Sequence, residues 1–338
     1  MPFVSLLHLV ASRQNLSEDQ AHAAMLAILA GEATTAQIAA FLVALNMKGE
    51  CAAELVGFAR AMRAKATRIE LDLGAEPLID TCGTGGDAGG TFNVSTAAAF
   101  VVAGAGVRVA KHGNRSLSSQ CGSADVLEEL GVNISMSPQV AARAIAEAGI
   151  AFLFAPAIHP AMKHAQPARA ELKMRTAFNL LGPLTNPAGA LYQLVGAPSH
   201  EAANLMAEAL SMLGVERAWI VHGSDGLDEI TLSGPTTVWD VRPGHIANFL
   251  VQPSDFGIEA AGLESVRGGD RVRNARIVRA ILGGEKGPTR DIVVVNAAAA
   301  LLVAGKAGNI IDAVAEARKA IDSGEAERRL VSLITISQ

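Results

Sequence analysis

A change of pattern near residue 73 constrains the fold most strongly. Beyond it, short apolar segments alternate with stretches of helical length; the strand candidates are residues 78–80, 107–110, 150–154, 191–195 and 218–222. This alternation predicts a largely parallel sheet with helices on both faces. Residues 233–251 look like strands joined by turns, which makes the expected sheet mixed. We therefore predict an α/β fold with a mixed, mostly parallel central sheet flanked by helices.

Residues 1–72 carry only helical signals. Ser17 with Gln20, and Thr34 with Gln37, form capping-box patterns before two helices, and a third helix is expected over residues 52–65. Three short helices cannot bury their own broad apolar faces, so they should pack on the rest of the chain or on a second subunit. The sequence thus predicts a helical domain over 1–72 and an α/β domain over 73–338.

Composition excludes several classes of function. Half of the 338 residues are hydrophobic, but only 4% are aromatic, which argues against the stacking surfaces that bind single-stranded nucleic acid. The net charge of −5 does not suit a nucleic-acid or anionic-membrane binder. Three cysteines without CxxC spacing predict reduced thiols and a cytoplasmic location. No apolar run of membrane-spanning length is present.

A glycine-rich stretch follows the first predicted strand. It runs from Asp80 to Asp87 as DTCGTGGD, and Gly83, Gly85 and Gly86 would let backbone N–H groups converge on an anion. The segment 93–96, NVST, then predicts the start of a helix, whose positive end would face the same anion. The stretch matches neither a nucleotide P-loop nor a dinucleotide fingerprint.

A second such stretch follows the second predicted strand. It spans residues 111–119, KHGNRSLSS, carries Lys111 and Arg115, and precedes a predicted helix over 123–130. Glycine clusters also occur in ordinary turns, and this chain has 33 glycines. The repeated position after a strand nevertheless favours anion binding, and two loops could hold the two phosphates of a polyphosphate.

Two further segments carry chemistry. Residues 159–187 concentrate cations and prolines, and from the residues alone a substrate pocket and a structural role stay equally open. Asp228 and Glu229 follow a predicted strand, at the carboxyl end where ligands of open α/β sheets bind. Beside a diphosphate, these hard oxygen ligands predict an Mg²⁺ site.

The motifs DTCGTGGD, FNVST, KHGNRSLSS, GSAD, HPAMK, RTAFNLLGPLTNP and DGLDE occur in this order along the chain. In them the sequence resembles the anthranilate phosphoribosyltransferases of tryptophan biosynthesis. The resemblance implies that a segment near 165–185 returns to the helical domain, and that homodimers form through this domain. It also implies the reaction, in which the amine of anthranilate attacks C1 of 5-phosphoribosyl 1-diphosphate and releases pyrophosphate.

The resemblance further implies roles for individual residues. The diphosphate sugar would be bound by Gly83, Gly86, Asp87, Thr91, Asn93, Val94, Ser95, Thr96, Lys111, His112, Gly113, Asn114, Arg115, Ser116, Leu117, Ser118, Ser119 and Ser123. Anthranilate would be surrounded by Gly83, His112, Asn114, His159, Arg169, Gly182 and Pro183. Two Mg²⁺ ions would be held by Ser95, Asp228 and Glu229. Lys111, Arg169 and His112 are the expected catalytic residues.

Breaking the C1–O bond places negative charge on pyrophosphate, which Mg²⁺, Lys111 and backbone donors would stabilise. Arg169 suits the anthranilate carboxylate because a guanidinium binds it through paired hydrogen bonds. An aryl amine is already neutral, so no general base is assigned. Two positions depart from the family pattern: Cys121 stands where serine is frequent, and Lys173 where glycine is usual.

Two other functions compete with this interpretation. A pyrimidine nucleoside phosphorylase shares the expected architecture, but its characteristic KHSTGGVGD-like and SGRGLG-like segments are replaced here. A nucleic-acid-binding relative without catalysis should show a basic surface and broken phosphate motifs, whereas this chain is acidic and its motifs are intact.

Overall fold

The structure, a computed structural model, describes residues 1–72, 74–85, 90–116 and 120–338. In these residues, seven strands form one sheet in the order β3-β2-β1-β4-β5-β6-β7. The strands are β1 (Leu78–Gly83), β2 (Arg108–Gly113), β3 (Ile150–Phe154), β4 (Tyr192–Gly196), β5 (Arg217–Gly223), β6 (Thr236–Arg242) and β7 (His245–Val251).

The first five strands are parallel, and β6 and β7 are antiparallel additions at one edge. The predicted mixed, mostly parallel sheet is therefore confirmed. Alternate residues of the strands face opposite sides of the sheet: Trp219 and Val221 belong to one buried cluster, and Ala218 and Ile220 to another. Burial on both faces explains why the strands are apolar throughout rather than alternating.

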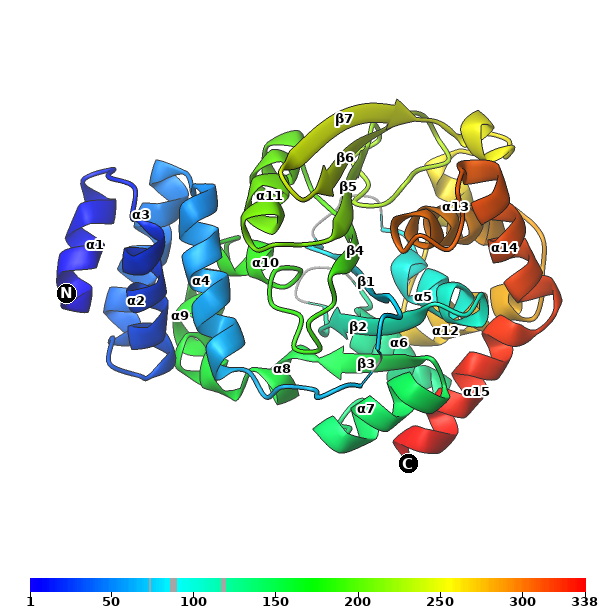
Figure 1. Ribbon diagram of the computed structural model, residues 1–338. Helices are drawn as coiled ribbons and strands as arrows, with labels where there is room; N and C mark the ends of the chain where they lie inside the picture. The colour runs from blue at the N-terminus through cyan, green and yellow to red at the C-terminus, as the bar shows by residue number, and fades with distance from the viewer. Residues whose placement is uncertain (73, 86–89, 117–119) are drawn as a thin grey trace.

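Helices from the middle and the end of the chain cover the first face (Figure 1). They are α5 (Val94–Gly104), α6 (Ser123–Leu130), α7 (Pro138–Glu147), α12 (Arg271–Leu282), α13 (Pro288–Val303), α14 (Ile310–Asp322) and α15 (Glu325–Ser337). The helix predicted over 123–130 is confirmed as α6. It has one buried face and one more exposed face, as an amphipathic helix requires.

The second face is covered by α11 (His200–Met212), and beyond α11 lie the N-terminal helices (Figure 1). These are α1 (Phe3–Ala11), α2 (Glu18–Leu29), α3 (Thr35–Lys48) and α4 (Ala52–Lys65). Both predicted capping boxes are present, at Ser17 and Thr34, whereas α1 was not predicted. No helix formed by the described residues is long and apolar enough to cross a bilayer.

A segment between β3 and β4 returns to the N-terminal helices. It contains α8 (Ala155–Ile158), α9 (Gln166–Leu172) and α10 (Phe178–Leu181), and α9 packs on α3. Ala165, Ala168 and Phe178 share a buried cluster with residues of α2, α3 and α4. The N-terminal helices thus bury their apolar faces against this chain, as expected of helices too short to bury them alone.

Candidate functional site

The chain places its motif loops where the strand order reverses. Successive strands run from β1 outward to β2 and β3, and then from β4 outward to β5, so β1 and β4 are neighbours whose following loops diverge. Ligands of open α/β sheets bind in the crevice outside the carboxyl ends of strands at such a point. β1 ends at Gly83 and β4 at Gly196, so the first glycine loop starts there.

The two adjacent carboxylates lie against this loop. An oxygen of Asp228 accepts the N–H of Gly85 at 3.1 Å, and an oxygen of Glu229 accepts the N–H of Ser95 at 3.1 Å. Ser95 is in the first turn of α5, so Glu229 also lies at the positive end of that helix. The structure therefore brings Ser95, Asp228 and Glu229 together at one site.

Two strand-end glycines make this approach possible. A Cβ on Gly83 would lie 2.9 Å from an oxygen of Asp228, and one on Gly196 would lie 1.7 Å from its backbone oxygen. A side chain at Gly196 would displace the loop that carries the carboxylates. Gly196 was not predicted, because its only local signal is that a glycine follows a predicted strand.

Lys111 reaches the same point from β2. It is 2% exposed, and its ammonium group donates to the carbonyl of Thr81 and, at 3.2 Å, to the hydroxyl of Ser95. Burial lowers the pKa of Lys111, and the nearby carboxylates of Asp80, Glu229 and Asp228 oppose this shift. The ammonium group of Lys111 is therefore buried next to the N-terminus of α5, where an anion would bind.

Two histidines lie next to each other beside Gly182. The rings of His112 and His159 are 5.2 Å apart, and Nδ1 of His112 is 3.0 Å from the carbonyl oxygen of Gly182. A carbonyl only accepts, so Nδ1 carries the proton and Nε2 is an acceptor. Among the described residues, Nε2 of either ring has no hydrogen-bond partner.

Both imidazoles are neutral at physiological pH. Burial lowers the pKa of His159 to about 3, and the neighbouring His112 adds to this effect. Burial also lowers the pKa of His112, although Asp80 opposes the shift. The pair therefore offers an uncharged, buried wall beside Gly182.

Asp80 and Asn186 hold His112 in place. Asp80 accepts the backbone N–H of His112 at 3.1 Å, and it accepts the Asn186 amide at 2.8 Å. That amide also donates to the carbonyl of Ala110, so one side chain links β1 and β2 to the segment after α10. Sequence reasoning missed this contact because 106 residues separate its partners.

Arg169 lies on α9, in the segment that returns to the N-terminal helices. Its guanidinium group is 5.1 Å from the ring centre of Phe178, and burial lowers its pKa. Within the described residues it forms no ion pair. A half-buried guanidinium without a carboxylate is suited to an anionic ligand.

Pro183, another residue predicted at the anthranilate site, is held by β4. Its carbonyl accepts a hydrogen bond from the Gln193 side chain at 2.7 Å.

The other predicted phosphate-loop residues have different surroundings. Arg115 pairs with Asp125 and Glu128 at 2.8 and 2.6 Å, and these hydrogen bonds raise its pKa, so its charge is already neutralised. Thr96 is buried within α5 together with Val94. Gly113, Asn114, Ser116 and Ser123 line the end of β2 and the start of α6, and Thr91 and Asn93 precede α5. Gly86, Asp87, Leu117, Ser118 and Ser119 lie outside the described residues.

Arg175 contacts the first glycine loop and was not predicted. It donates to the carbonyl of Gly85 at 2.7 Å and to that of Thr84 at 3.5 Å. Its own carbonyl accepts from Asn46 on α3 at 3.4 Å. Arg175 therefore connects the N-terminal helices to the loop that meets Asp228.

Lys173, where the family pattern has glycine, ends α9 in the left-handed conformation, with φ of 48° and ψ of 34°. That conformation costs a non-glycine residue about 1 kcal/mol. Lys173→Gly should therefore raise the free energy of unfolding by up to about 1 kcal/mol in urea titration. Glu171→Gly, inside α9, is the control and should lower it by about 1 kcal/mol. A loss of stability in Lys173→Gly would contradict this account.

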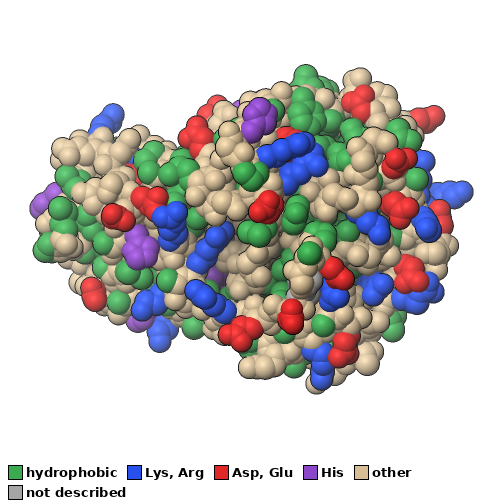
Figure 2. Space-filling model, viewed as in Figure 1, with side chains coloured by type: hydrophobic (Ala, Val, Ile, Leu, Met, Phe, Trp, Pro, Cys, Tyr) green, Lys and Arg blue, Asp and Glu red, His purple; other side chains and the backbone are tan. Residues whose placement is uncertain are grey.

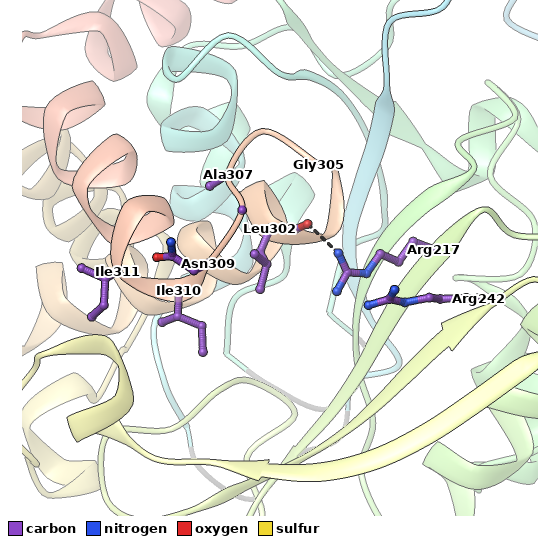
Figure 3. Close-up of a pocket in the computed structure, with 9 residues that line it drawn as sticks. Arg217, Arg242, Leu302, Gly305, Ala307, Asn309, Ile310 and Ile311 are labelled. Carbon is purple, nitrogen blue, oxygen red and sulfur yellow. Dashed lines mark hydrogen bonds between the residues drawn. The ribbon is translucent and has the colours of Figure 1, made fainter.

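A cavity of about 750 Å³ lies outside the candidate site, next to the start of α14 (Figure 3). Arg217 and Arg242 border it, and both donate to the carboxylate of Asp240. Arg217 begins β5, whereas the motif loops follow the carboxyl ends of the parallel strands. This cavity is therefore separate from the candidate site.

The chain matches two family models over most of its length. The helical bundle domain of a glycosyl transferase family matches residues 4–66, and the α/β domain of that family matches residues 75–327. An anthranilate phosphoribosyltransferase from Solibacter usitatus is 58% identical over 97% of this chain and 96% of its own length. The chain belongs to the anthranilate phosphoribosyltransferase family. The member from Moorella thermoacetica is 53% identical over 96% of the chain and 95% of its own length.

Solved structures of anthranilate phosphoribosyltransferases share the fold. The crystal structure of the Thermus thermophilus protein superposes with a TM-score of 0.93 at 44% identity, covering 98% of this chain and 99% of its own. The Saccharomyces cerevisiae enzyme in complex with PRPP and Mg superposes with a TM-score of 0.91 at 29% identity, covering 99% and 97%. The family resemblance of the motifs and the expected fold are both confirmed.

Proposed function

We propose that this chain transfers the phosphoribosyl group of 5-phosphoribosyl 1-diphosphate to the amine of anthranilate, releasing pyrophosphate. One observation carries the proposal: a buried lysine, two carboxylates and a helix N-terminus meet at the strand-order reversal, and the returning segment adds a guanidinium that no carboxylate neutralises within the described residues. The lysine, the carboxylates and the helix N-terminus suit a metal-bound diphosphate, and the guanidinium suits an aromatic carboxylate. Relatives with this name, and a yeast relative solved with PRPP and Mg, support the same activity.

The residues at the α5 N-terminus would bind the donor. Lys111 and the positive end of the α5 dipole would supply positive charge where pyrophosphate departs, which would lower the barrier by stabilising charge that develops in the transition state. Ser95, Asp228 and Glu229 offer oxygen ligands only, and the described residues contain no group of three or more His, Cys, Asp or Glu side chains that could hold a metal ion by themselves. Few protein ligands, all oxygen, suit Mg²⁺. When bound, two such ions would neutralise the diphosphate.

The residues around the two histidines would bind the acceptor. Arg169 would hold the anthranilate carboxylate, while Gly83, Asn114, Gly182 and Pro183 would enclose the ring. Nε2 of His112 is an acceptor and would take a hydrogen bond from the amine, which orients the nitrogen lone pair toward C1. Because both histidines are neutral, they add no charge that would repel the positive charge developing on the ribose. Their main effect is to orient the acceptor.

Four predictions from the sequence belong to this proposal: homodimers through the N-terminal helices, the division of the chain into two domains, two Mg²⁺ ions per subunit and a cytoplasmic location. Val4 on α1 and Met47 on α3 are exposed apolar side chains on the helices that would form the dimer interface. On the face shown in Figure 2, Lys and Arg are interspersed with Asp and Glu, which does not favour a nucleic-acid-binding role.

The test is a coupled measurement on the purified chain. Anthranilate fluorescence should fall only when 5-phosphoribosyl 1-diphosphate and Mg²⁺ are both present, and pyrophosphate should appear in equal amount. Omitting either component is the control. Phosphorolysis of uridine or thymidine without anthranilate consumption would instead identify a nucleoside phosphorylase.

A further inference from the structure

Two buried asparagines form hydrogen bonds with residues in or next to the candidate site. Asn274 lies on α12 and Asn296 on α13, and each is 1% exposed. We propose that they are positioning residues: Asn274 orients Asn93 in the diphosphate-sugar site, and Asn296 orients the segment that carries Asp228 and Glu229. The inference rests on the proposed function for the ligands, but the contacts themselves are independent of it.

Asn274 fixes the side chain of Asn93. Its amide donates to Oδ1 of Asn93 at 3.0 Å, and its own oxygen accepts the N–H of Gly269 at 2.8 Å. The amide of Asn93 then donates to the carbonyl of Cys121, at 3.2 Å. Asn93 does not cap α5 with its side chain. Its rotamer is therefore set by Asn274 of α12 on one side and by the backbone carbonyl of Cys121 on the other.

The segment before α12 adds to this support. Thr91 pairs with Arg267 as an isolated antiparallel bridge, and the N–H of Gly268 donates to the carbonyl of Gly90 at 2.9 Å. A Cβ on Gly268 would lie 2.6 Å from the nitrogen of Phe92, so only glycine allows this approach. The backbone just before α5 is thus paired with this segment, and Asn274 extends the pairing to a side chain.

Asn296 holds both backbone groups of Ile230. Its oxygen accepts the N–H of Ile230 at 3.0 Å, and its amide donates to the carbonyl of Ile230 at 3.0 Å and to that of Ile292 at 2.9 Å. Ile230 directly follows Glu229. Apart from Asn296, residues 292–303 of α13 are all apolar, and an asparagine there is unfavourable unless its polar atoms are bonded. Two of its three hydrogen bonds go to Ile230.

The two residues serve as controls for each other. Asn274→Ala should raise the KM for 5-phosphoribosyl 1-diphosphate about tenfold, with the Mg²⁺ concentration for half-maximal rate within about twofold of wild type. Asn296→Ala should raise that Mg²⁺ concentration about tenfold and change the sugar KM less. The KM for anthranilate should stay within about twofold in both. If both variants shift the two constants by equal factors, or change only the melting temperature, the proposal is overturned.

Amide hydrogen exchange tests the contacts without ligands. In the free protein, exchange should accelerate at residues 90–93 in Asn274→Ala and at residues 225–230 in Asn296→Ala, each leaving the other segment unchanged. Uniform acceleration would contradict the assigned roles. If an alanine variant does not fold, the serine variant of the same residue is measured instead. A wild-type protein that shows no turnover would contradict the proposed function, and the exchange result would still decide the roles of the two asparagines.

Discussion

Replacing Asp228 with Asn and Glu229 with Gln together should lower the Mg²⁺-dependent rate of anthranilate consumption by about a thousandfold or more. The amide side chains keep an oxygen that can accept from Gly85 and Ser95, so the loop contacts survive. What is lost is the negative charge that binds Mg²⁺. Steady-state rates over a range of Mg²⁺ concentrations measure the effect.

Glu325→Gln with Glu327→Gln is the matched control, because it removes two acidic charges from the start of α15. It should leave the rate and its Mg²⁺ dependence unchanged. An unchanged rate in the Asp228 and Glu229 variant would exclude the proposed metal site. A melting temperature close to that of wild type should accompany the loss of activity, because the substitution keeps the hydrogen-bond acceptors.

Replacing Arg169 with Ala should raise the KM for anthranilate about a hundredfold or more, while the KM for 5-phosphoribosyl 1-diphosphate stays within about twofold. The physical reason is that the carboxylate would lose its paired hydrogen bonds from a half-buried guanidinium. Arg169→Lys keeps the charge but not the two-pronged geometry, so an intermediate KM is expected. Initial rates with each substrate varied in turn give both constants.

Arg143→Ala, on α7, is the control for loss of an arginine outside the site. It should change neither constant. Equal increases in both KM values in Arg169→Ala would contradict the assignment of Arg169 to the acceptor. An unchanged KM for anthranilate would show that another residue binds its carboxylate.

The sequence predicted the parts of the fold that depend on local order. Apolar strand segments at regular spacing identified most of the sheet, and two capping boxes identified the helices α2 and α3; α4 was predicted over residues 52–65 without one. The helix α1 was missed because Pro2 at its start forms no side-chain cap. Its helical character comes from apolar residues such as Phe3 and Leu6 that pack on the other helices.

The candidate site was predictable where several polar or charged residues are adjacent in the sequence, as Asp228 and Glu229 are. The hydrogen bonds that hold the site residues in place were not predictable. Asn186 meets Asp80 across 106 residues, and Asn274 meets Asn93 across 181. Such contacts have no spacing signal, because they arise only when the fold brings distant segments together. The ion pairs of Arg115 were also missed, although Asp125 and Glu128 follow it by only 10 and 13 residues.

Arg175 joins two parts of the site that would receive different substrates. Its backbone is bonded to α3, on the acceptor side, and its guanidinium group is bonded to the loop beside the donor. If the N-terminal helices swing toward the sheet, the loop must travel with them or lose these bonds. Through these bonds of Arg175, any displacement of α3 would act on the position of this loop.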